Sequence, residues 1–347
     1  MIFVLALVCL LCIFYVHVLA QYSKSQILDI YQVTYASNEA LQQTCNIKQP
    51  FVFYRGRAFA LPLFFTTNKQ SVSVKDISDY RVTVEDAEAE EGAEAEAEAG
   101  AEAEAEAEAG AEAEAEAEAG AGAGAEAGAE AGTESGAGTG LVLEDRSDVV
   151  CRGIDMPFYS ALQIMRLDAK AEYFSETNYA FMDEAGILDT VIRLDRELRP
   201  RYTTLTTYDM LFGSIDVGTP LRYHTQTRKF IYVYQGTIRV KLASWKYAKY
   251  LKQKKDFLHY DFRSEVNVWD ESKANKDKYL LDNIQFLEID VAEGMVLYVP
   301  SYWWFSIKYT RADTLLFEYN HSSFVNNVAF LGNYAQCSLQ NASIIYK

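Results

Sequence analysis

The second half of the chain is a succession of short apolar segments separated by turn residues, and this pattern most constrains the fold. Many short strands of this kind are typical of a β-sandwich or a β-barrel, since no single strand can bury a core alone. We therefore predict a mainly β (α+β) domain. The predicted strands lie at 203–208, 211–216, 219–224, 229–234, 237–242, 285–290, 295–299, 304–309 and 314–318.

Helical spacing, with apolar residues three and four apart, appears in four other segments and predicts helices beside the strands. These segments are 25–44, 156–167, 182–192 and 324–339. Near the N-terminus only two short strands are predicted, at 49–56 and 80–84. Two strands are too few for a core, so we expect the N-terminal part to fold together with the strands of the second half.

A low-complexity segment at 85–140 separates these two parts. Ala and Glu alternate there between Gly residues, with few side chains that could be buried, so we predict a disordered acidic insert. Residues 85–134 hold 19 acidic residues and no Lys or Arg; removing them from the total of 49 leaves 30 acidic residues against 32 basic ones. The net charge of −17 therefore describes the insert. The predicted domain parts are 22–84 and 141–347.

An almost unbroken apolar run occupies residues 2–20. Its length matches the roughly 20 residues that cross a bilayer, and no basic residue precedes it as in a signal peptide. We therefore favour a retained single-pass transmembrane anchor at residues 1–21, with the membrane as a partner through residues 2–20. The alternative is secretion after cleavage at Val18-Leu19-Ala20.

Two segments carry the residues that suggest chemistry. Residues 218–236 read GTPLRYHTQTRKFIYVYQG, and residues 293–307 read EGMVLYVPSYWWFSI. Together with QPFVFYRG at 49–56 and MPFYSAL at 156–162, they resemble the cupin-like and JmjC-like double-stranded β-helix proteins. The resemblance is greatest to membrane-anchored cupin-like proteins of large DNA viruses. It implies a cupin, or jelly-roll, domain with flanking helices and a location in a virion or host membrane.

Active members of this family bind Fe(II) through a His-x-Asp/Glu motif and a later His, which leaves coordination positions for 2-oxoglutarate and oxygen. The resemblance places Arg222 at the first His, His224 at the acid and Phe305 at the later His. Arg is permanently charged and Phe carries no donor atom. We therefore expect a degenerate iron site without a cofactor, in which Arg222, Tyr223, His224, Trp304 and Phe305 line a vestigial or ligand-binding pocket. A register shifted by one residue would give His224-Thr225-Gln226 and would leave Phe305 in place.

Three functions follow. The first is a non-catalytic, membrane-anchored structural or interaction protein with a protein partner. The second is an Fe(II)/2-oxoglutarate-dependent hydroxylase or demethylase; here His259 and Asp261 supply a His-x-Asp motif and His321 the third ligand. The third is a module that binds a small anion through Arg222, Tyr223 and His224, since Arg suits a carboxylate.

Lysines and aromatic residues alternate at 245–255. This pattern is compatible with contacts to nucleic acid or anionic lipid. Since the chain without its insert is nearly neutral, we favour a solvated lysine face over apolar residues and do not expect a nucleic-acid partner.

Overall fold

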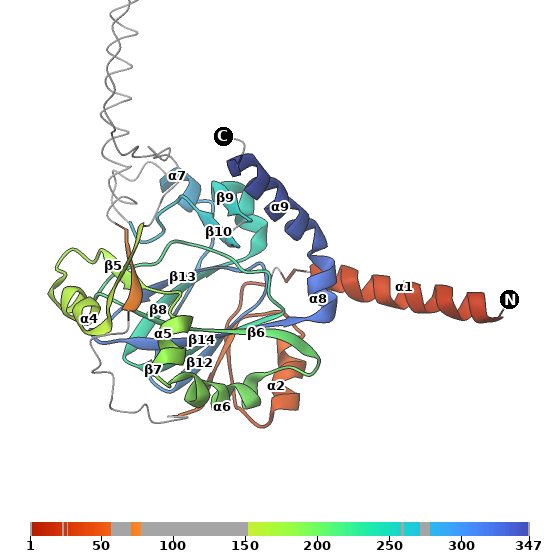
Figure 1. The fold of residues 1–347 in the computed structure, drawn as a ribbon, viewed down its shortest axis with the longest axis horizontal. Coiled ribbons are helices and arrows are strands. Elements are labelled where there is room, and N and C mark those ends of the chain that lie inside the picture. Colours follow the sequence, from red (N-terminus) through yellow and green to blue (C-terminus); the bar gives the residue numbers. More distant parts are fainter. Residues whose placement is uncertain are drawn as a thin grey trace, which may run out of the picture. The chain divides into compact units, whose positions relative to one another are not determined.

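The computed structural model describes residues 2–22, 24–25, 27–56, 71–77, 152–257, 260–270 and 278–345. These residues belong to one unit of the chain, which comprises residues 1–80 and 151–347 (Figure 1). The predicted insert at 85–140, the predicted strand at 80–84 and His259 lie outside the described residues.

Strands of the second half pair in a nested order. The first, β6 (Thr203–Gly213), pairs antiparallel with the last, β14 (Leu315–Ser323). Further in, β7 (Arg228–Gln235) pairs antiparallel with β12 (Met295–Val299). Since β14 also pairs with β7, these four strands form the centre of one sheet.

The remaining segments continue this nested order and form a second, smaller sheet. The segment 218–222 meets β13 (Trp304–Tyr309) through isolated bridges, and β8 (Thr237–Ala243) pairs with both β13 and β11 (Leu287–Ala292). The first segment thus pairs with the eighth, the second with the seventh, the third with the sixth and the fourth with the fifth. This nested pairing is that of a jelly roll, so the structure is mainly β and consistent with a cupin fold.

Strands from both sides of the insert join the larger sheet. The strand order is β1-β2-β12-β7-β14-β6-β5-β3-β4, in which β2 pairs with β12 and β3 pairs with both β4 and β5. A separate hairpin consists of β9 and β10. The bounds are β1 Tyr31–Val33, β2 Phe51–Tyr54, β3 Ser71–Asp76, β4 Arg152–Pro157, β5 Tyr173–Ser175, β9 Gln253–Asp256 and β10 Asp261–Ser264.

Helices flank the strands, and the main core lies between the larger sheet and α2, α4, α5 and α6. On α6, for example, Val191, Leu194 and Leu198 are buried in this core. The bounds are α1 Ile2–Tyr22, α2 Asn38–Cys45, α4 Phe158–Leu167, α5 Tyr179–Glu184, α6 Leu188–Leu198, the 3₁₀ helix η2 Trp245–Tyr250, α7 Lys278–Leu281, α8 Phe324–Ala329 and α9 Leu331–Ile345.

Two of the predicted helices are wrong in extent. The segment 25–44 contains β1 first, because Tyr31 pairs with Phe51 of β2 and their rings stack at 5.9 Å. The helix α2 begins only after Ser37, whose Oγ accepts a hydrogen bond from Ala40 N at 3.2 Å. The segment 182–192 is split between α5 and α6, because Gly186 takes a positive φ of 67° that ends a helix.

The predicted membrane anchor at residues 1–21 coincides with α1. Within the described ranges, no helix is both long and apolar enough to cross a bilayer.

Candidate functional site

Arg222, His224 and Phe305 come together on the inner side of the smaller sheet. Arg222 and Phe305 face each other across a bridge, in which each backbone N–H donates to the other's carbonyl, at 3.0 and 2.8 Å. The guanidinium carbon of Arg222 lies 5.7 Å from the centroid of the Phe305 ring, and the His224 ring lies 6.3 Å from it. The three positions that the family resemblance singled out are therefore neighbours.

Tyr223 and Trp304 do not join this group, which corrects the prediction of a single five-residue pocket. Successive side chains of an extended segment point to opposite faces. The two rings lie 4.8 Å apart in a separate apolar cluster, where Tyr223 also stacks on Phe262 at 5.1 Å. The hydroxyl of Tyr223 accepts a hydrogen bond from Gln253 Nε2 at 2.8 Å.

Arg222 forms an ion pair with Glu176, a residue that sequence reasoning missed. Its Nη1 lies 2.5 Å from Glu176 Oε2, and Lys75 Nζ lies 2.5 Å from the other carboxylate oxygen. Burial raises the pKa of Glu176, but the charges of Arg222 and Lys75 outweigh burial and hold this pKa at about 2. Glu176 is therefore ionised at neutral pH and partly neutralises two cations.

A second ion pair also lies close to the Phe305 ring. Lys229 of β7 pairs with Glu318 of β14, and both side chains are only 8% exposed. Lys229 Nζ lies 5.3 Å from the centroid of the Phe305 ring, and Asn320 Nδ2 donates to Glu318 at 2.6 Å. Burial lowers the pKa of Lys229, and the charge of Glu318 opposes that effect.

Asp209 of β6 connects this network to the turn that carries Glu176. Its carboxylate accepts hydrogen bonds from the backbone N–H groups of Thr177 and Asn178, both at 2.7 Å. Burial, together with the nearby charge of Glu318, raises the pKa of Asp209 to about 7. The same carboxylate therefore holds the turn in place and titrates near neutrality.

His224 is buried and held in one orientation. Its Nε2 lies 2.9 Å from the carbonyl oxygen of Val299, which requires the proton on Nε2. Burial lowers the pKa of His224 to about 3, and the charge of Lys229 adds to this effect. His224 is therefore a neutral imidazole at physiological pH.

These residues do not fit an Fe(II) ion. A non-haem Fe(II) oxygenase site needs two imidazoles and a carboxylate on one face. The corresponding positions here hold a cation, an imidazole whose Nε2 is bonded to the backbone, and an apolar ring. Across the described parts of the chain, no group of three His, Cys, Asp or Glu residues could hold a metal ion.

Two residues of the alternative ligand set, Asp261 and His321, lie in different surroundings. His259 lies outside the described residues. Asp261 lies 3.0 Å from Arg263 Nη1, whereas His321 is fully buried with its Nε2 2.6 Å from Asp195 Oδ1. Asp261 and His321 thus each have a partner other than a metal.

A small pocket opens beside Arg222. Its volume of about 40 Å³ has room for one or two water molecules. Two arginines, one lysine and two carboxylates line it, so its charge is nearly balanced. The lining residues are Lys75, Phe174, Glu176, Pro220, Arg222, Asp261 and Arg263.

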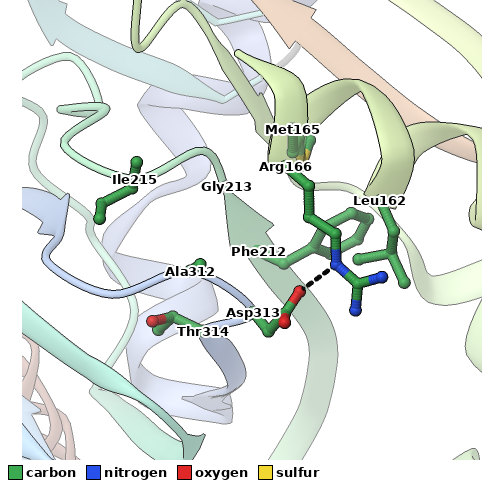
Figure 2. A pocket seen from close by; sticks show the side chains of 9 residues that line it. All are labelled: Leu162, Met165, Arg166, Phe212, Gly213, Ile215, Ala312, Asp313 and Thr314. Atoms are coloured by element: carbon green, nitrogen blue, oxygen red, sulfur yellow. Dashed lines mark hydrogen bonds and ion pairs between the residues drawn. The ribbon is translucent and has the colours of Figure 1, made fainter. Parts of the chain in front are cut away.

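A second pocket, shown in Figure 2, lies between α4 and the end of β6. Its volume is about 10 Å³, which is room for a single water molecule at most. Arg166 reaches across to Asp313 at 2.7 Å. This pocket shares no lining residue with the one beside Arg222.

Comparison with known proteins adds little. No family model and no curated protein matches the chain. Among solved structures, the chain resembles YcfD, a ribosomal oxygenase from Escherichia coli in complex with cobalt and succinic acid, with 14% sequence identity and a TM-score of 0.32. The match covers 55% of this chain and 42% of that chain.

Proposed function

We propose that this protein is a non-catalytic jelly-roll protein with a structural or interaction role, in which an internal ion network replaces an iron site. The observation that carries the proposal is the ion pair between Arg222 and Glu176 at 2.5 Å. A guanidinium is a non-ligand, and a cation at the first ligand position repels a metal ion.

The ion network also stabilises the polar interior without a metal ion. An unpaired buried charge destabilises a fold strongly, whereas a pair that is also hydrogen-bonded is tolerated. Glu176 pairs with Arg222 and Lys75, and Glu318 pairs with Lys229. The polar interior is therefore satisfied mainly by the protein's own charges.

The proposal also includes a location at a membrane. The apolar run at residues 2–20 and the family resemblance support attachment to a membrane, either of a virion or of a host cell. A folded domain held at a membrane acts through its surface, so its partner is proposed to be another protein.

The test is a metal and turnover analysis of the full-length chain, which is purified, incubated anaerobically with Fe(II), and then supplied with 2-oxoglutarate and oxygen. We expect substoichiometric iron by mass spectrometry, and no conversion of 2-oxoglutarate to succinate above that of heat-denatured protein. Stoichiometric iron with succinate formation, lost on replacement of His321 by Ala, would instead establish the hydroxylase function.

One observation favours a second candidate, the binding of a small anion. Within the described residues, the Nε atom of Arg222 is buried and has no hydrogen-bond partner, and Arg263 lines the same pocket. A carboxylate is the group that two such guanidinium groups recognise. The volume of about 40 Å³ restricts the ligand to the size of formate or acetate.

Thermal unfolding with formate, acetate and succinate tests this candidate. The expected result is a rise in Tm with formate or acetate, abolished in the Arg263→Gln variant. Chloride at the same ionic strength is the control. Equal shifts with chloride and the carboxylates would leave the pair of guanidinium groups with a purely structural role.

A further inference from the structure

An ammonium group lies between two aromatic rings on the outer side of the smaller sheet. Lys24 Nζ is 3.8 Å from the ring centroid of Trp245 and 4.5 Å from that of Tyr302. The two rings lie 5.4 Å apart at an angle of 72°, so they form two walls around the cation. Distances below about 6 Å from a ring face are those of an attractive cation–π contact.

The rings are fixed before any cation reaches them. Tyr302 has a φ of 64°, a conformation that an aromatic residue rarely adopts, and its N–H donates to the carbonyl of His224 at 2.9 Å. Trp245 stacks on Trp304 at 6.1 Å and lies edge-on to Tyr223 at 4.9 Å. A backbone conformation held against its preference is a frequent mark of a binding site.

The site recognises its cation without a counter-charge. Among the described residues, no carboxylate pairs with Lys24. Burial lowers the pKa of Lys24, and the charge of Lys255 lowers it further. Aromatic walls without a carboxylate are suited to an alkylammonium ion, above all a quaternary one, which cannot donate hydrogen bonds.

The contact also anchors the segment that follows α1. Ser244 Oγ donates to the carbonyl of Ser25 at 3.4 Å, and Lys48 Nζ donates to the carbonyl of Ala20 at 2.8 Å. Lys24 is therefore one of several contacts that hold this segment against the β domain, and its release would not by itself unfold the domain.

We propose that Trp245 and Tyr302 form a binding site for alkylammonium groups, which the chain's own Lys24 fills and which a quaternary ammonium ligand occupies when Lys24 leaves. The site is independent of the interior network around Arg222, because its rings pack on Tyr223 and Trp304, whose side chains face away from that network.

The test is a titration of the full-length chain with choline, followed by NMR of ¹⁵N-labelled tryptophan side chains. In the Lys24→Ala variant, which keeps every ring, choline is expected to shift the indole signal of Trp245. The wild-type chain is expected to need roughly tenfold more choline for the same shift, because Lys24 competes for the rings. The neutral isostere 3,3-dimethylbutan-1-ol is expected to cause no comparable shift.

Lys249→Ala is the matched control, because Lys249 lies 4.7 Å from the ring of Tyr250 and not at the Trp245 site. It should respond to choline as the wild-type chain does. Equal choline affinity of the wild-type and Lys24→Ala chains would overturn the proposal, as would an equal response to the neutral alcohol. The indole signal of the buried Trp303 reports in every sample whether the fold is retained.

Discussion

The carboxylate of Glu176 and the guanidinium of Arg222 lie 2.5 Å apart in the interior of the jelly roll. Glu176 comes from the turn after β5 and Arg222 from the segment that bridges to β13, so the pair connects the two sheets. Their side chains are 10% and 18% exposed. The pair therefore acts as a structural contact between the two sheets.

Replacing Glu176 with Gln should destabilise the protein, since it leaves the cations of Arg222 and Lys75 without their counter-charge. Breaking a buried pair costs about 3–5 kcal/mol, and the partial exposure of both side chains brings the expected loss nearer 2 kcal/mol. Urea unfolding of the full-length chain measures it.

Asp290→Asn is the control for this loss. Asp290 pairs with Arg239 at 2.7 Å on the surface, where such pairs add little, so no measurable change is expected. Similar values for Glu176→Gln and Asp290→Asn would mean that the Arg222–Glu176 pair contributes nothing beyond surface electrostatics.

The sequence predicted the strands around the site well and the network inside it poorly. The predicted strands at 295–299 and 304–309 are confirmed as β12 and β13. The first is a continuous apolar run, MVLYV, and the second, WFSIKY, is rich in aromatic and branched residues, which favour strands. Glu176 and Asp209 belong to no motif. Glu176 reaches Arg222, and Asp209 reaches the turn at Thr177 and Asn178, only through the tertiary pairing of strands, which local sequence patterns do not encode.

The alternation of side chains between the two faces of a strand predicts which of the five site residues lie together. The one-letter run RYH at 222–224 lies in an extended segment, so its middle residue must face away from the other two. The same rule separates Trp304 from Phe305. Sequence reasoning grouped all five residues by their place in a motif, and the structure divides them between the interior and the outer aromatic cluster.

Rebuilding the ligands should create a metal site if the three positions are correctly identified. A chain with Arg222→His, His224→Asp and Phe305→His is expected to bind Co(II) stoichiometrically, with Glu176 still paired with Lys75. The visible absorption of bound Co(II) and calorimetry measure this. Phe305→His alone is expected to bind no metal, because Arg222 remains beside it at the bridge.

Alanine substitutions at two glycines with positive φ distinguish the cost of backbone strain from the cost of a steric clash. At Gly236, with a φ of 85°, an added Cβ would lie 2.8 Å from the Cα of Thr314, whereas at Gly186, with a φ of 67°, nothing lies within 4 Å. Gly186→Ala should lose about 1 kcal/mol from strain alone. Gly236→Ala should lose at least twice as much, measured by urea unfolding, and equal losses would show that Thr314 moves aside.

Asp209 and His224 should shape the pH dependence of stability in opposite directions. The pKa of Asp209 is raised from 3.8 to about 7, so the folded state binds more protons than the unfolded state, and the stability from this group is lost as the pH rises through 7. The pKa of His224 is lowered from 6.5 to about 3, so its contribution is present above pH 6.5 and is lost as the pH falls towards 3. Above the pH range in which Glu176 titrates, these two contributions oppose each other, so the wild-type free energy of unfolding should change little between about pH 5 and pH 6.5.

Single variants should reveal the two opposing slopes. In Asp209→Asn only the His224 contribution remains, so the free energy of unfolding should rise with pH over this window. In His224→Gln only the Asp209 contribution remains, and the free energy should fall as the pH rises. Urea unfolding at intervals of half a pH unit measures both slopes. The same slope in the two variants would mean that one of these groups is not buried in the folded state, because burial is the cause that opposes ionisation in both.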